Sequence, residues 1–71
     1  MIMTREQLHN GLLVNHVKYG QQYIILSANA RMKDSQKGWV DCVVYVPWYE
    51  NDYQCFTREV NSFLAEFELV I

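Results

Sequence analysis

The chain has 71 residues, of which 51% are hydrophobic and 14% aromatic, and its formal net charge at pH 7 is −2. This length predicts a single domain, residues 1–71, with a small core of marginal stability, and the composition excludes intrinsic disorder. The acidic charge argues against nucleic acid as a partner, and no apolar segment reaches the roughly 18 residues of a membrane-spanning helix.

The N-terminal segment carries no signal-peptide pattern, so we expect a cytoplasmic protein without membrane contact. The letters "TREQ" match a capping box, in which the side chains of Thr4 and Gln7 bind each other's backbone N–H groups. This motif predicts a short helix that runs to about Asn10. Gly11 is expected to end the helix, because glycine readily adopts a left-handed conformation.

Short segments rich in β-branched and aromatic residues predict five strands, over residues 12–18, 23–30, 39–46, 53–57 and 67–71. The segments 19–22, 31–38 and 47–52 are predicted turns or loops, and residues 58–66 a short helical turn. Strands at this spacing predict a mainly β fold. We expect a small five-stranded SH3-like barrel or a strongly bent antiparallel sheet, with the helical turn before the last strand as in SH3-like barrels.

Side chains alternate between the two faces of a strand, which divides the central strands into two sets. The predicted core set is Ile24, Leu26, Ala28 and Ala30 in the second strand and Val40, Cys42, Val44 and Val46 in the third. The predicted outer set is Tyr23, Ile25, Ser27 and Asn29 in the second strand and Trp39, Asp41, Val43 and Tyr45 in the third. A loop over residues 47–52 would place Asp41 opposite Arg58 as an ion pair.

Six of the ten aromatic residues lie between Trp39 and Phe56, outside the predicted core set. Such a face is covered by the N-terminal helix, covered by another subunit, or left free for binding. For Trp39 and Val43 these alternatives stay open, whereas the turn residues Trp48 and Tyr49 are expected to be exposed. The candidate binding residues are Trp39, Tyr45, Trp48, Tyr49, Tyr53 and Arg58. Arg58 offers a planar fork for an anion or carboxylate.

No catalytic or metal-binding pattern is visible. Cys42 and Cys55 are interpreted as two buried reduced thiols rather than a disulfide. His9 and His16 lack the spacing of a structural zinc site, and the glycines are too far apart for a phosphate loop. We therefore expect neither an enzyme nor a cofactor.

Three segments, "YGQQYIILSANA", "VVYV" and "FTREVNSFLAEFELV", resemble the domain-of-unknown-function family 1653. The matching positions are Gly11, His16, Gly20, Tyr23, Leu26, Val43, Val44, Tyr45, Phe56, Arg58, Phe63 and Leu64. The chain departs from the family pattern at Glu59, where the family tends to have proline, and in the position of the alanine at Ala28 or Ala30. The resemblance implies a small barrel of bacterial or phage origin and no established activity.

The leading functional hypothesis is a non-enzymatic binding module. It would be a phage or bacterial accessory protein that docks on a host protein through its aromatic surface and acts as a regulator or inhibitor. The alternative is a homo-oligomer that binds or sequesters a nucleotide signal, with aromatic stacking on the base and Arg58 on a phosphate. A third hypothesis is single-stranded nucleic-acid binding on the aromatic sheet, against which the net charge argues.

Overall fold

The structure, a computed structural model, describes residues 2–49 and 54–70. Five antiparallel strands form one sheet in the order β4-β3-β2-β1-β5. The elements are η1 (Arg5–Gln7), β1 (Leu13–His16), β2 (Gln22–Asp34), β3 (Gly38–Pro47), β4 (Phe56–Glu59), α1 (Val60–Glu66) and β5 (Phe67–Leu69).

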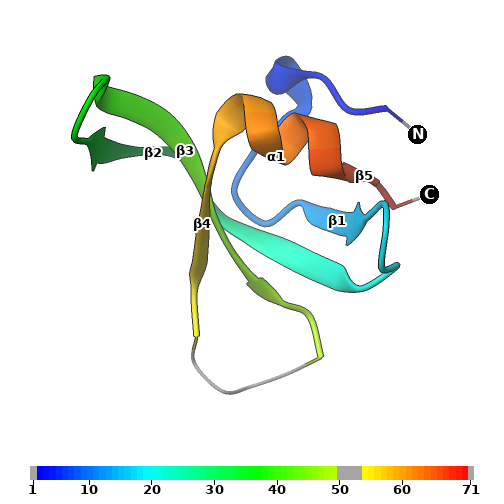
Figure 1. Cartoon of the computed structure of the whole chain (residues 1–71). Helices are drawn as coiled ribbons and strands as arrows, with labels where there is room; N and C mark the ends of the chain where they lie inside the picture. The colour runs from blue at the N-terminus through cyan, green and yellow to red at the C-terminus, as the bar shows by residue number, and fades with distance from the viewer. Residues whose placement is uncertain (1, 50–53, 71) are drawn as a thin grey trace.

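The sheet bends strongly around α1 and stays open (Figure 1). Among the described residues no ladder joins β4 to β5, and α1 connects these two edge strands. The prediction of a mainly β fold with a helical turn before the last strand is confirmed, in its form of a strongly bent sheet. No helix within the described ranges has the length and hydrophobicity to cross a lipid bilayer.

The N-terminal helix is shorter than predicted. It is a single 3₁₀ turn, in which the Thr4 N–H donates to Gln7 Oε1 at 2.8 Å. The chain then leaves helical geometry, because Asn10 and Gly11 form hydrogen bonds with β2. The Gly11 N–H donates to the Ile25 carbonyl at 2.7 Å, and Asn10 Oδ1 accepts the Ala28 N–H at 2.9 Å.

The segment predicted as a polar loop, residues 31–38, is mostly strand. β2 continues to Asp34, and β3 begins at Gly38, whose positive φ of 79° suits the tight connection. The Asp34 carboxylate closes this turn by accepting the N–H groups of Gln36 and Lys37 at 2.8 and 2.9 Å. Polar composition misled the prediction because a two-stranded ribbon can leave its side chains in solvent.

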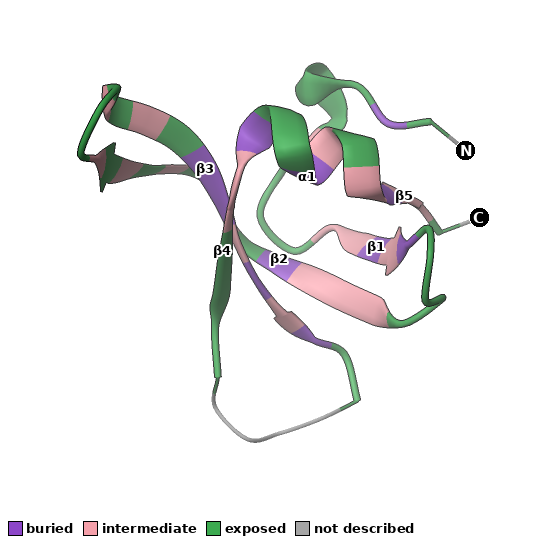
Figure 2. Cartoon of the chain, viewed as in Figure 1, coloured by how far each residue is buried: buried purple, intermediate pink, exposed green. Residues whose placement is uncertain are grey.

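The core lies where the bent sheet faces α1 (Figure 2). Its buried members are Met3, Val14, Ile25, Val43, Tyr45, Val60, Phe63 and Phe67. The predicted faces of β2 and β3 are therefore wrong at most positions: Ile25, Val43 and Tyr45 point inward, and Leu26 is 48% exposed. Cys42 is the exception, since it belongs to the predicted core set and is buried.

Two physical causes account for this error. α1 contributes only Val60 and Phe63 as buried residues, so large side chains from the strands must fill the concave interior. In addition, the β2–β3 register shifts between Ile25 and Ser27 and again before Ala30, which breaks the strict alternation that the prediction assumed.

The register between β3 and β4 also differs from the prediction, by two residues. Val43 lies opposite Arg58 and Tyr45 opposite Phe56. The predicted pair of Asp41 with Arg58 is therefore wrong, and Asp41 instead forms an ion pair with Arg5. Among the described residues β4 begins at Phe56, whereas the predicted start of this strand, Tyr53, lies outside them. Because side chains alternate with a period of two, this shift does not change which residues of β3 and β4 share a face of the sheet.

Candidate functional site

A pocket of about 210 Å³ lies between the two edge strands. We call it the aromatic pocket, and its lining residues are His16, Tyr19, Tyr23, Tyr45, Phe56, Arg58 and Phe67. Every strand contributes at least one of these residues, and Tyr19 comes from the turn between β1 and β2. The pocket thus occupies the side of the sheet where β4 and β5 face each other without pairing.

The walls of the aromatic pocket are aromatic rings in mutual contact, and Tyr23, Tyr45 and Phe67 meet edge to face. The Tyr45 ring centroid lies 5.3 Å from that of Tyr23 and 5.1 Å from that of Phe67. Tyr23 and Phe67 also contact each other, at 5.5 Å. Phe56 lies 5.8 Å from Tyr45 on the β4 side. Interlocked rings of this kind resist rearrangement, so the pocket is largely preformed.

Arg58 is the cation of this pocket, and its position is fixed by two contacts. Its Nε donates to Tyr45 Oη at 3.2 Å, and its guanidinium carbon lies 5.5 Å from the Phe67 ring centroid. Within the described part of the chain, Arg58 forms no ion pair with a carboxylate. A half-buried guanidinium that is oriented by neutral groups is suited to binding an anion.

His16 lines the pocket and is held in place by hydrogen bonds. Its ring is buried, and Nδ1 accepts the backbone N–H groups of Lys18 and Tyr19 at 3.2 and 3.3 Å. Because Nδ1 is an acceptor, we assign the ring proton to Nε2, which lies 3.8 Å from Glu66 Oε2. These contacts hold the turn that carries Tyr19.

Tyr19 forms an exposed flat surface at the edge of the pocket. Its ring stacks on that of His16, with centroids 4.9 Å apart and an interplanar angle of 29°. The side chain of Lys18 places its Nζ 5.3 Å from the Tyr19 centroid, so a second positive charge lies beside the pocket. Sequence reasoning gave no role to Tyr19, whose only signal was an aromatic residue beside the turn glycine Gly20.

The five predicted binding residues that the structure describes do not form one surface. Trp39 lies near the start of β3 and Trp48 just after its end, so nearly the whole length of the strand separates them. Trp48 and Tyr49 are exposed neighbours, whereas Tyr45 is only 4% exposed. Tyr53 lies outside the described residues. Of the predicted residues within the described ranges, Tyr45 and Arg58 alone meet in the aromatic pocket.

The cysteines are both free, as predicted, but only Cys42 is buried; Cys55 is exposed, which corrects the prediction for that residue. Burial raises the pKa of the Cys42 thiol, and the neighbouring Asp41 carboxylate adds to the effect. The described residues contain no group of three or more side chains placed to hold a metal ion.

The chain matches no family model, no curated protein and no solved structure at a significant level. The resemblance to family 1653 stays a prediction. Any functional conclusion must therefore come from the geometry of the molecule itself.

Proposed function

We propose that this protein is a non-enzymatic binding module for a small ligand that carries a flat ring and an anionic group, as nucleotides do. The observation that carries the proposal is Arg58, a guanidinium fixed by Tyr45 and Phe67 inside an aromatic pocket and in no ion pair among the described residues. Tyr45 takes one of the donors of Arg58, and the two terminal nitrogens provide the fork for an oxyanion.

The size of the pocket limits how the ligand binds. A volume of about 210 Å³ is below the 300–1,000 Å³ usual for drug-sized ligands, so one ring enters and the remainder lies outside. The exposed Tyr19 provides a stacking surface at the edge, and Lys18 lies close enough to add to the positive potential there. Base stacking and phosphate binding together give this site its proposed preference for phosphorylated nucleosides.

The test is a thermal unfolding assay with a panel of nucleoside monophosphates, cyclic nucleotides and dinucleotides, each beside its phosphate-free nucleoside. A ligand at 100 times its Kd stabilises the folded state by about 2.7 kcal/mol. For a domain of this size, that corresponds to a rise in Tm of roughly 10–20 °C. We expect the phosphorylated members to raise Tm and the free nucleosides to have little effect.

A matched pair of variants locates the binding. Tyr19→Ala and Tyr49→Ala both remove a highly exposed tyrosine, at 72% and 76% exposure, but only Tyr19 lines the pocket. Tyr19→Ala should weaken the thermal shift, and Tyr49→Ala should leave it unchanged. Arg58→Lys keeps the charge but loses the planar fork, and should also weaken it. If no member of the panel shifts Tm, or if both tyrosine variants respond alike, the proposal fails.

Docking on a host protein, as a phage or bacterial regulator or inhibitor, is the second candidate. It is favoured by Trp48 and Tyr49, which are exposed and lie with ring centroids 6.5 Å apart beyond the end of β3. Exposed tryptophan and tyrosine are the residues most often found at binding hot spots. Native mass spectrometry of the protein and its Trp48→Ala variant from host lysate tests it, since only the parent protein should retain a partner at fixed stoichiometry.

A further inference from the structure

The distal part of the β2–β3 hairpin projects from the domain. We call residues 30–42 the arm. β1 pairs with β2 only as far as Ile24, and β4 pairs with β3 no further than Cys42. Beyond the Ala30–Cys42 pair, the two strands of the arm therefore pair only with each other among the described residues, and Figure 1 shows them extending to one side. A two-stranded ribbon of this kind contributes little to stability by itself.

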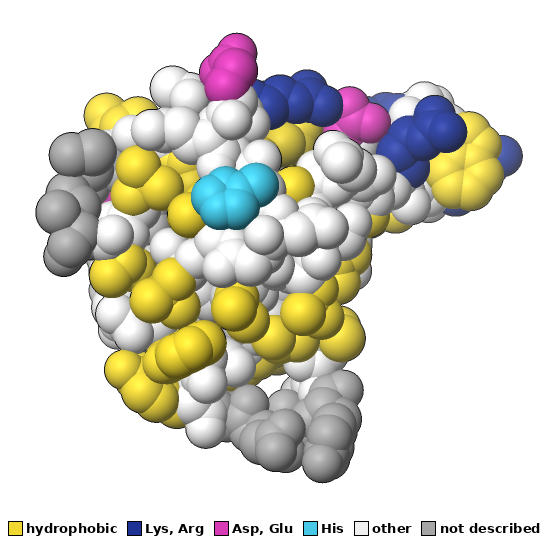
Figure 3. Space-filling view, turned by 180° about the vertical axis from the view of Figure 1, so that it is seen from behind, with side chains coloured by type: hydrophobic (Ala, Val, Ile, Leu, Met, Phe, Trp, Pro, Cys, Tyr) yellow, Lys and Arg dark blue, Asp and Glu magenta, His cyan; other side chains and the backbone are white. Residues whose placement is uncertain are grey.

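One face of the arm is aromatic and basic. Lys33 lies directly opposite Trp39, and Arg31 directly opposite Asp41, so these four side chains share a face. Trp39 is 63% exposed, and Lys33 Nζ lies 5.5 Å from its ring centroid. Figure 3 shows Lys and Arg side chains gathered beside a hydrophobic side chain on the projecting arm.

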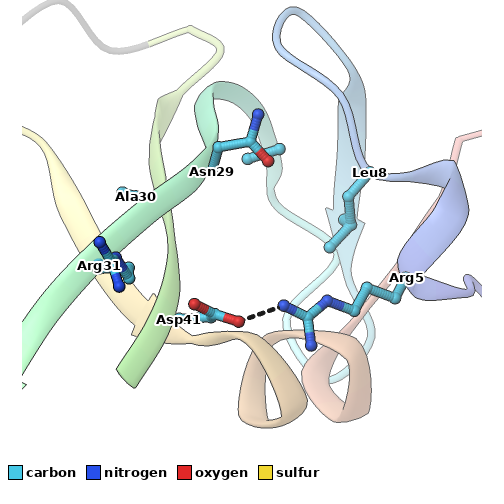
Figure 4. Close-up of a pocket in the computed structure, with 7 residues that line it drawn as sticks. Arg5, Leu8, Asn29, Ala30, Arg31 and Asp41 are labelled. Carbon is cyan, nitrogen blue, oxygen red and sulfur yellow. Dashed lines mark hydrogen bonds and ion pairs between the residues drawn. The ribbon is translucent and has the colours of Figure 1, made fainter. Parts of the chain in front are cut away.

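The same face continues into a hollow of about 360 Å³ at the base of the arm. Arg5 reaches across this hollow from η1 to Asp41, and Arg31 lines its other side (Figure 4). The charge of Asp41 is thus matched by Arg5, and Arg31 and Lys33 are left in excess on the face. Lys37 adds a further cation in the turn at the tip, where it lies near the Asp34 carboxylate. Arg5 and the three cations of the arm thus stand against two carboxylates, Asp34 and Asp41, for a local net charge of +2.

This local charge is not cancelled by the acidity of the whole chain. Two of the eight carboxylates, Asp34 and Asp41, lie in the arm, and the described others lie in η1, β4, α1 and β5. The molecule is 35 Å long, whereas the screening length at physiological ionic strength is about 8 Å. The potential at the arm is therefore set by the arm's own residues, and the sequence argument against nucleic acid, which used the total charge, does not apply to it.

We propose that the arm is a second binding surface, separate from the aromatic pocket, and that it binds single-stranded nucleic acid. An exposed flat ring with cations beside it on one face is the combination that stacks an unpaired base and neutralises its phosphates. Trp39 stacks the base, and Arg31, Lys33 and Lys37 contact the backbone. An acidic polypeptide would neutralise these cations but has no nucleobase to stack on Trp39. Lys and Arg along the arm also oppose strand addition by a second copy.

The experiment measures fluorescence anisotropy of a labelled 12-nucleotide oligo(dT) with the full chain. Three phosphate contacts predict a slope of about −2 in log K against log salt, which is an affinity about 20-fold lower at 200 mM than at 50 mM salt. Trp39→Ala should weaken binding roughly 5- to 150-fold. Trp48→Ala is the matched control, because it removes the other exposed tryptophan, and it should leave the affinity unchanged. Circular dichroism confirms that both variants are folded.

Four outcomes would overturn the proposal. The first is no binding at 50 mM salt, and the second is equal loss of affinity in the two tryptophan variants. The third is poly-glutamate competing with the oligonucleotide, with its own binding weakened by Trp39→Ala to the same degree, which would assign the surface to an acidic polypeptide. Because the aromatic pocket is proposed to take phosphorylated nucleosides, Tyr19→Ala separates the two sites: it should leave oligonucleotide affinity unchanged, and the fourth outcome, a loss in Tyr19→Ala but not in Trp39→Ala, would assign the binding to the pocket.

Discussion

Replacing Val43 and Val44 by alanine, one at a time, tests which face of β3 is the core. The residues are adjacent, and the substitution is the same, so the loss of β-propensity largely cancels between them. Val43 is completely buried against the core, whereas Val44 is only partly buried, on the opposite face.

The expected magnitudes follow from this difference. Val43→Ala removes two buried methyl groups at about 0.8 kcal/mol each and leaves a cavity, for a total of roughly 2–3 kcal/mol. For Val44→Ala we expect about 1 kcal/mol or less. A chain of this length has a free energy of unfolding of about 4–11 kcal/mol, so the first variant loses a large fraction of it. Its Tm should fall by roughly 10–20 °C.

The assay is urea unfolding followed by far-ultraviolet circular dichroism, with Tm from a thermal scan. The midpoint should fall much more for Val43→Ala than for Val44→Ala, with similar m-values for both. If Val44→Ala is the more destabilising variant, the alternation predicted from the sequence is right and the packing described above is wrong.

Three further predictions concern single groups. Tyr45→Phe removes the acceptor of the Arg58 Nε but keeps the buried ring; it should lower ligand affinity in the thermal shift assay while costing only about 1 kcal/mol of stability in urea. Iodoacetamide should alkylate the exposed Cys55 first and Cys42 only on unfolding, because Cys42 is buried and its pKa is raised; mass spectrometry showing equal rates would contradict this. Backbone N–H groups lower the pKa of Asp34, so its stabilisation of the turn is complete above the ordinary pKa of 3.8 and is lost as the pH falls through the lower folded-state pKa. Amide shifts of the arm in an NMR titration from pH 5 to 2 should show this loss, and an Asp34→Asn variant should not.

The candidate site was only partly predictable from the sequence. Arg58 was recognised because a cation that follows an aromatic strand and opens a turn is unusual. Tyr19 and His16 were not assigned a role, since their stacking and the two N–H groups that His16 accepts exist only once β1 turns into β2. Tyr45 was selected for the wrong reason, as a surface aromatic, although it belongs to the core and reaches the pocket only with its hydroxyl and ring edge.

By itself, the sequence determined the local features of this protein: five strands in nearly the right places, the short helix before the last strand, the glycine turns and the capping contact at Thr4. These depend on neighbouring residues, so they can be inferred from short segments. The tertiary structure alone decided which face of β2 and β3 is buried, because that depends on the volume that α1 leaves to be filled and on register shifts within β2. It also decided the β3–β4 register, and with it the placement of Arg58 among the aromatic rings rather than beside Asp41.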